Sequence, residues 1–385
     1  MFSILGIGAM LFGGRFSGGN QQMSRGKLDA LRARFLLVLD EMRDRVSDAA
    51  DKLDGNYRWY HPPADTLIAQ AGGPPRMWER NPNGKDTWFG GVARVGVGMT
   101  SLTEGGGAIT FSEPDDMPTE VELEPATGKA LQEFVRYQSV AYGTPALISL
   151  LVEPGYRITG EREATLGGLM RAILAQLAFF HGPDHLQLVV VTDDVSEWEW
   201  VKWLPPHNGN PRQIDGAGPA RMVYTSVSEF ADSQFTDAVR RAGAFVPPRH
   251  AGSRDAVAPM PHTVVISDIA SGSWYSVMTS TGVQGWTFFD IRGGVPACQD
   301  ERGTRTLRLK EDGVIDAVPR DGNWAPDAQD GFQFFAITDQ LERFEAEQLA
   351  QQIARSRIAE PYEDIGDDLS DFKRPRDILS YYGIN

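Results

Sequence analysis

The sequence predicts an α/β fold built on a mostly parallel, doubly wound sheet. The evidence is an alternation of strand-like and helix-like segments from residue 127 onward. Short apolar runs typical of buried strands occur at residues 148–152, 186–191, 221–225, 262–266 and 286–290. Segments with helical spacing lie around them, at 128–142, 166–180, 229–241 and 344–358. Because parallel strands need crossover connections, this order favours a sheet covered by helices on both faces.

A long amphipathic helix is expected ahead of the sheet. Ser24 can cap it, and it runs to about Leu53. Its apolar positions are spaced by threes and fours: Leu28, Leu31, Phe35, Leu39, Met42 and Val46. This pattern fits a stalk that projects from the body, and it also fits an ordinary surface helix.

The remaining segments complete a four-part organisation. Residues 15–125 are expected to hold the stalk helix and a small β-containing module, and residues 126–360 the α/β domain. The apolar residues 1–14 are interpreted as the end of a transmembrane helix, because the run is shorter than the roughly 20 residues that span a bilayer. An apolar tail or a core helix is the alternative. Residues 361–385 are charged, contain prolines and are interpreted as a linker to a further domain.

Composition excludes some classes of function. Lysine and arginine number 37 against 52 aspartate and glutamate, a net charge of −15. Nucleic-acid backbones are held by clustered basic residues, so nucleic acid is not an expected partner. The single cysteine, Cys298, rules out an internal disulfide and a zinc ribbon.

Residues 156–168 have the strand–loop–helix order of a phosphate-binding loop without its chemistry. Such loops read GxxxxGK[ST], in which backbone amides and the lysine hold phosphates and the hydroxyl binds Mg²⁺. Here Gly160 is present, but no GK[ST] follows it. Glu161 and Glu163 would place negative charge against a triphosphate, while Arg162 is a possible substitute cation. Gly160, Glu161, Arg162 and Thr165 are therefore one half of a candidate degenerate nucleotide site.

The other half is Asp268, which ends the apolar run His262-Thr263-Val264-Val265-Ile266-Ser267. An acid in this place can hold Mg²⁺ through water. No glutamate adjoins it to polarise a water molecule, and any buried strand can end in aspartate. A structural role for both halves is favoured over a working hydrolase, so no catalytic or metal-binding residue is assigned.

Two further patterns are interpreted as structural. His181 and His185 have the spacing of a helical metal pair, but Gly182-Pro183 breaks the helix between them, which favours a turn. The tryptophans of the 197–205 segment are expected to lie mainly in the core, with a partner-binding patch as the alternative. They are Trp198, Trp200 and Trp203.

Several uncommon local motifs together resemble a known family. They are Gln21-Gln22-Met23-Ser24-Arg25, Asn56-Tyr57-Arg58-Trp59-Tyr60-His61-Pro62, Pro75-Arg76-Met77-Trp78-Glu79-Arg80, Gly128-Lys129-Ala130-Leu131-Gln132-Glu133-Phe134, His181-Gly182-Pro183-Asp184-His185, Trp200-Val201-Lys202-Trp203-Leu204-Pro205 and Asp377-Ile378-Leu379-Ser380-Tyr381-Tyr382-Gly383-Ile384. In this order they resemble EccC, the FtsK/SpoIIIE-type membrane ATPase of mycobacterial type VII (ESX) secretion systems, and the ESX-5 type most. The resemblance covers nearly the whole chain.

The resemblance implies a P-loop-NTPase-like fold and a place at the cytoplasmic face of the plasma membrane. It implies other membrane-complex subunits and downstream ATPase domains as partners, with secreted WXG100, PE and PPE proteins handled indirectly. Two functions follow. The first is mechanical coupling between the downstream motors and the membrane pore. The alternative is a degenerate domain that binds ATP with Mg²⁺ and hydrolyses it slowly.

Overall fold

The computed structural model describes most of the chain between residues 24 and 356. The described ranges are 24–71, 76–80, 90–102, 125–160, 163–208, 214–215, 218–219, 221–241, 245–246, 261–299, 303–318 and 331–356. The segments expected to be a transmembrane end (1–14) and a linker (361–385) lie outside these ranges, as do Glu161 and Arg162. Within the described ranges, no helix combines the length and apolar character needed to cross a bilayer.

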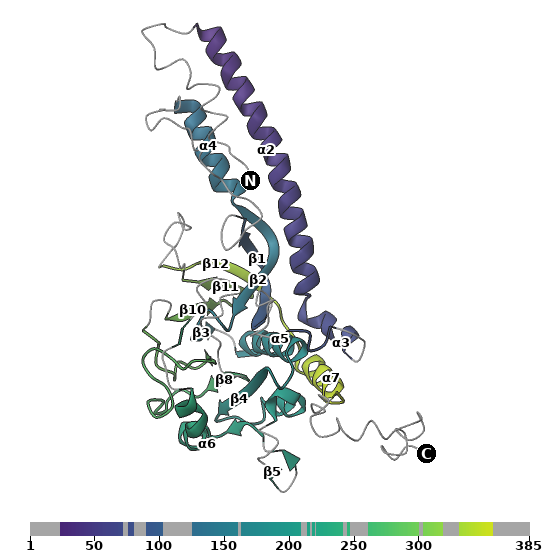
Figure 1. Ribbon diagram of the computed structural model, residues 1–385, viewed down its shortest axis with the longest axis vertical. Helices are drawn as coiled ribbons and strands as arrows, with labels where there is room; N and C mark the ends of the chain where they lie inside the picture. The colour runs from purple at the N-terminus through teal and green to yellow at the C-terminus, as the bar shows by residue number, and fades with distance from the viewer. Residues whose placement is uncertain are drawn as a thin grey trace, which may run out of the picture.

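One ten-stranded sheet organises the body, in the order β2-β1-β12-β11-β10-β3-β9-β8-β4-β7 (Figure 1). Its strands are β1 (Val92–Ser101), β2 (Val140–Ser149), β3 (Gly155–Gly160), β4 (Leu186–Thr192), β7 (Val223–Tyr224), β8 (His262–Asp268), β9 (Trp286–Asp290), β10 (Thr304–Leu309), β11 (Val314–Ala317) and β12 (Gln333–Thr338). A separate pair is formed by β5 (Ile214–Asp215) and β6 (Gly218–Pro219). The α-helices are α2 (Arg25–Tyr60), α3 (Leu67–Gln70), α4 (Pro125–Gln138), α5 (Glu163–Phe180), α6 (Val227–Arg240) and α7 (Arg343–Ile353). Short 3₁₀ turns are η1 (Ala64–Thr66), η2 (Glu199–Trp203) and η3 (Pro205–His207).

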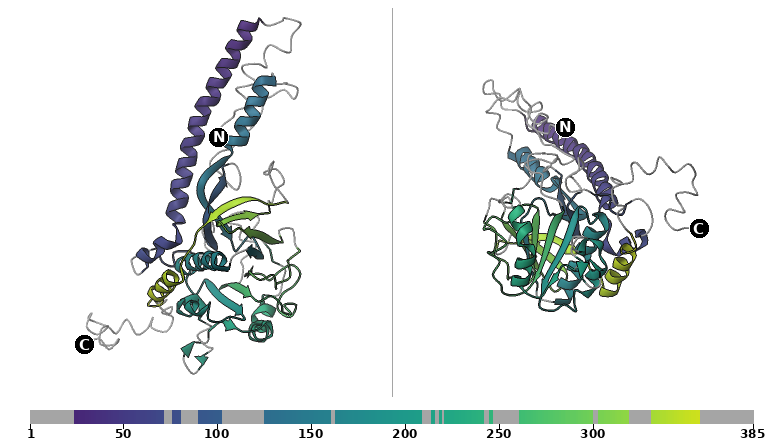
Figure 2. Two further views of the ribbon diagram at one scale, coloured as in Figure 1. Left: turned by 180° about the vertical axis from the view of Figure 1, so that it is seen from behind. Right: turned by 60° about the horizontal axis from the view of Figure 1, so that its bottom comes forward.

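The strands from β10 to β7 run parallel, which confirms the predicted doubly wound sheet. Every residue of β8 and β9 is buried, as expected for strands covered on both faces. Helix α5 lies in the core cluster on one face together with residues of α7, and α6 lies in the cluster on the other. Figure 2 (right) shows the sheet between these layers.

The other half of the sheet is antiparallel and contains a strand from early in the chain. Strand β1 pairs with β2 on one side and with β12 on the other. The helix expected at 128–142 is α4, which ends at Gln138, and β2 starts at Val140 instead of at residue 148. Long-range pairing with β1 gives the 140–149 segment a strand partner, which local periodicity does not reveal. One sheet therefore unites the segment before residue 125 with the α/β strands.

The long amphipathic helix is present and projects from the body as a stalk (Figures 1 and 2). Helix α2 has 36 residues, a length of about 54 Å at 1.5 Å per residue. Ser24 occupies the predicted N-cap position, but its side chain makes no capping hydrogen bond, and the helix continues past Leu53 to Tyr60. The predicted stripe packs against α4 and the tips of β1 and β2. This cluster contains Phe35, Leu39, Met42, Val46, Leu102, Leu131, Phe134 and Ala141.

Candidate functional site

The phosphate-loop position is a strand–loop–helix connection, as the sequence indicates. Strand β3 ends at Gly160 and α5 begins at Glu163. Counting from Gly160 through the GxxxxGK[ST] spacing, Leu166 stands in the lysine position and Gly167 in the hydroxyl position. Leu166 is partly buried and packs on the main core. The position that would contact phosphate is therefore occupied by an apolar core side chain.

The connection that precedes α7 packs against the first turns of α5. A methyl group added at Gly168 would lie 2.1 Å from Oε1 of Gln340. The Leu341 backbone N–H donates to the Gly168 carbonyl oxygen at 3.2 Å, and Arg171 Nε donates to the Leu341 carbonyl oxygen at 2.8 Å. Protein groups thus occupy the space beside this part of α5.

Asp268 lies at the carboxyl edge of the sheet, and its carboxylate accepts three side-chain hydrogen bonds. Oδ2 accepts from the Trp198 indole N–H at 2.8 Å and from the Thr192 hydroxyl at 3.1 Å. Oδ1 accepts from Arg292 Nε at 2.8 Å in an ion pair. Asp268 is 6 % exposed. These donors use three of the roughly four lone-pair positions of a carboxylate, so a metal ion held through water would have to compete with them.

The two halves of the predicted site are on different strands with β9 between them. Strand β3 pairs with β9, and β9 pairs with β8, whose last residue is Asp268. Gly160 and Thr165 belong to β3 and α5, and no described contact joins either residue to Asp268. Among the described residues, the two halves of the predicted site are therefore about 10 Å apart, two strand spacings, and are not joined by direct contact.

A second buried acid at the carboxyl edge of the sheet, Asp290, is not among the predicted site residues. It ends β9 and is 2 % exposed. It accepts from Arg157 Nε at 3.0 Å and from the backbone N–H groups of Gly294 and Val295 at 3.0 and 3.3 Å. Its position at the end of an apolar strand was the available signal, and its role is to fold the following loop back onto the sheet.

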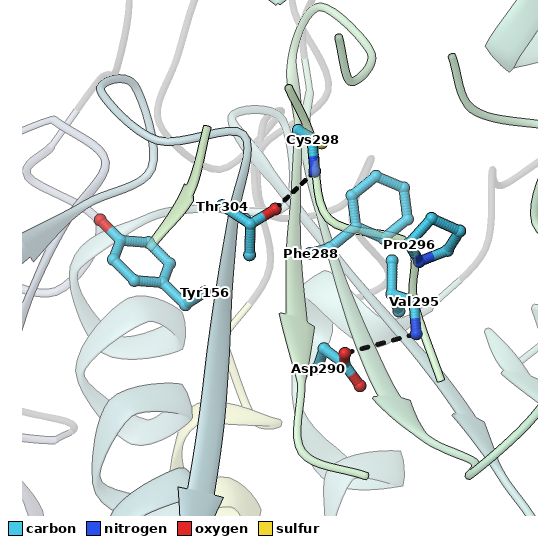
Figure 3. Close-up of a pocket in the computed structure, with 8 residues that line it drawn as sticks. Tyr156, Phe288, Asp290, Val295, Pro296, Cys298 and Thr304 are labelled. Carbon is cyan, nitrogen blue, oxygen red and sulfur yellow. Dashed lines mark hydrogen bonds between the residues drawn. The ribbon is translucent and has the colours of Figure 1, made fainter. Parts of the chain in front are cut away.

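A small hollow lies under this loop (Figure 3). Tyr156, Phe288, Asp290 and Cys298 line it among others, and the Cys298 N–H donates to the Thr304 hydroxyl at 2.8 Å across it. No residue of the predicted nucleotide site lines this hollow, so it lends no support to that site.

The other sequence interpretations have clear outcomes. His181 directly follows α5. Its Nε2 accepts from the Gly91 N–H at 2.8 Å, and its Nδ1 donates to the Leu177 carbonyl oxygen at 2.9 Å. Burial lowers the pKa of His181 to about 3, so the ring is neutral. Both ring nitrogens form hydrogen bonds with backbone groups. The described residues contain no group of three metal-ligating side chains. Among the tryptophans, Trp198 and Trp200 are core residues as predicted, whereas Trp203 is 38 % exposed.

Comparison with known proteins identifies the family. No family model matches the chain. The ESX-5 secretion system protein EccC5 of Mycobacterium tuberculosis is 52 % identical over 385 residues, which is 100 % of this chain and 26 % of that protein. The chain belongs to the EccC family of ESX secretion proteins. The ESX secretion system protein EccC of Thermomonospora curvata is 31 % identical over 92 % of this chain and 26 % of its own length.

The family assignment confirms the resemblance and its ESX-5 character. The ESX-4 protein EccC4 of M. tuberculosis is 34 % identical over 52 % of this chain, well below the EccC5 value. The cytoplasmic domain of T. curvata EccC is a solved structure that aligns with 52 % of this chain and 25 % of its own chain, at 12 % identity and a TM-score of 0.33. The chain spans about a quarter of the length of the curated relatives it matches.

Proposed function

We propose that this EccC segment is a mechanical part of a type VII secretion motor that neither holds nor hydrolyses ATP. Its stalk and ATPase-like body would couple downstream ATPase domains to the membrane pore during export of WXG100, PE and PPE proteins. It would act at the cytoplasmic face of the plasma membrane, in contact with other subunits of the complex. Nucleic acid is not among the proposed partners.

The carboxylate of Asp268, which accepts three side-chain hydrogen bonds, carries the proposal. Its three donors come from β4, from the turn that leads into η2, and from the residues after β9, so it joins separate parts of the carboxyl edge. A metal ion bound at Asp268 would have to compete with these contacts for the carboxylate. The apolar Leu166 in the lysine position supports the same conclusion.

Calorimetric titration with ATP and Mg²⁺ tests the proposal. We expect no heat of binding above dilution for wild type at ATP concentrations up to the millimolar range. A P-loop protein of known affinity in the same buffer serves as the positive control. Micromolar binding by wild type that disappears in Asp268→Ala would show instead that the degenerate site binds nucleotide, the alternative function.

A further inference from the structure

The carbonyl end of the stalk helix is held by arginine side chains. Arg76 Nη1 donates to the Trp59 carbonyl oxygen at 2.7 Å, and Arg80 Nη2 donates to the Tyr60 carbonyl oxygen. The guanidinium groups thus take up orphan carbonyls at the negative end of the α2 dipole, where cations are most favourable. Arg80 is 4 % exposed, so this contact is inside the protein.

The same short segment also holds the carbonyl end of α5. The backbone N–H groups of Trp78 and Arg80 donate to the carbonyl oxygens of Phe179 and Phe180 at 2.9 and 3.0 Å. The Trp78 indole N–H donates to the Ala178 carbonyl oxygen at 3.2 Å. Residues 76–80 therefore cap both helices: their backbone and indole N–H groups cap α5, and their guanidinium groups cap α2.

Cation–π contacts join the two caps. The Arg80 guanidinium lies 3.5 Å from the centre of the Phe180 ring, and that of Arg76 lies 5.4 Å from it. Arg76 also lies over Trp59, at 5.1 Å. Trp78 has φ of +63°, a conformation that costs a non-glycine residue free energy and persists only when its surroundings hold it. The backbone and indole hydrogen bonds of Trp78 to α5 offset this free-energy cost.

We infer that residues 76–80 form a clamp that locks the stalk helix α2 to the core helix α5, so that stalk and sheet move as one lever. The inference deepens the proposed coupling role and rests on it for its purpose. A third arginine continues the connection from the stalk: Arg94 donates to the His61 carbonyl oxygen at 3.1 Å and pairs with Asp339 at 2.7 Å, just before α7. A displacement of the stalk would thus reach the segment that leads into α7.

Spin-label distance measurements test the clamp in the whole chain. Labels at Asn56→Cys on the stalk and Asp184→Cys after α5, both exposed positions, are placed in a Cys298→Ser background. We expect one narrow distance distribution. Arg80→Met, alone or with Arg76→Met, should widen it at least about twofold, because a helix end freed from its contacts moves on a larger scale.

Amide hydrogen exchange provides a second readout at the joint itself. The His61 N–H donates to the Tyr57 carbonyl oxygen at 2.7 Å in the last turn of α2. Its exchange should become about tenfold faster in Arg80→Met, the change that corresponds to loss of one buried hydrogen bond. Arg45→Met, which removes an exposed intrahelical pair with Glu41, is the matched control and should change neither readout.

The outcomes separate the clamp from the proposed function. A broad distribution in the unmodified background, or no change in either readout in the clamp variants, would overturn the clamp. If Arg80→Met does not fold, Arg76→Met and Arg80→Lys decide, since lysine keeps the charge but loses the forked donors. Both should then broaden the distribution, and unchanged widths would overturn the clamp. ATP binding alongside a narrow distribution would contradict only the proposed function.

Discussion

Replacing Asp268 with alanine should destabilise the protein. The change leaves the Trp198 indole N–H and the Thr192 hydroxyl without their acceptor inside the core. Each buried donor left unsatisfied costs about 1–3 kcal/mol. The ion pair with Arg292 adds little, because that side chain is 42 % exposed and solvent screens the interaction. The expected loss in free energy of unfolding is about 3 kcal/mol.

Urea denaturation followed by tryptophan fluorescence measures this loss. Asp193→Ala is the matched control, because Asp193 is an exposed acid at the same edge of the sheet. Its effect should stay within about 0.5 kcal/mol. Arg292→Ala should fall between the two variants, at about 1 kcal/mol, since the neutral donors remain.

One result would refute the structural assignment of Asp268. Residues kept for ligand binding are commonly retained at a cost to stability, so their removal often stabilises the protein. If Asp268→Ala proved as stable as Asp193→Ala, or more stable than wild type, the carboxylate would not be a structural acceptor. The reasoning from its three contacts would then fail.

Three further predictions concern packing and pH. Gly96→Ala should destabilise the sheet by about 3 kcal/mol or prevent folding, because the new methyl group would lie 2.0 Å from the Ile337 carbonyl oxygen. The control is Gly55→Ala in α2, where a new methyl group would meet nothing within 4 Å. This variant should increase the free energy of unfolding by about 0.5–1 kcal/mol in the same denaturation assay. Phe35→Ala should lower the free energy of unfolding by about 3–5 kcal/mol and make the amides of α2 and α4 exchange faster, because Phe35 is buried between the two helices. Leu37 is exposed on α2, so Leu37→Ala is the control and should leave hydrogen exchange unchanged. Equal effects of the two variants would contradict the packing of α2 on α4. Burial lowers the pKa of four histidines to about 3 or 4: His61, His181, His207 and His262. Below about pH 6.5 these histidines bind protons in the unfolded chain but remain neutral in the folded chain. The free energy of unfolding should therefore fall as the pH drops, by about 1 kcal/mol per histidine between pH 7 and 5.5. A stability that does not change over this pH window would contradict the prediction.

Local periodicity was enough to predict most of the parallel strands and the long amphipathic helix. Apolar side chains at threes and fours must share one face of a helix, and α2 buries that face against α4. The absence of a GK[ST] sequence after Gly160 was also visible directly. These properties depend on neighbours along the chain, so a sequence displays them.

The role of β1 could not be predicted in this way. Its residues are typical of a strand, but their partners in β2 lie about 40 to 57 residues away and those in β12 about 240 residues away. Which strands pair depends on how much apolar surface each arrangement buries over the whole molecule. Short-range spacing therefore suggested a separate small module where the structure has one shared sheet.

The candidate site shows the same division. From the sequence, Asp268 was an acid at the end of a strand, for which a structural role was favoured and metal binding was the alternative. Its partners Thr192, Trp198 and Arg292 come from other segments of the chain, and they use its lone pairs. Likewise, Arg76 and Arg80 were part of a distinctive motif with no assigned role until the ends of α2 and α5 met around them. The sequence by itself determined which chemical groups are missing, because absence of a side chain needs no folding to establish. Only the tertiary structure decided what the remaining groups do, because hydrogen-bond partners are chosen by proximity in space.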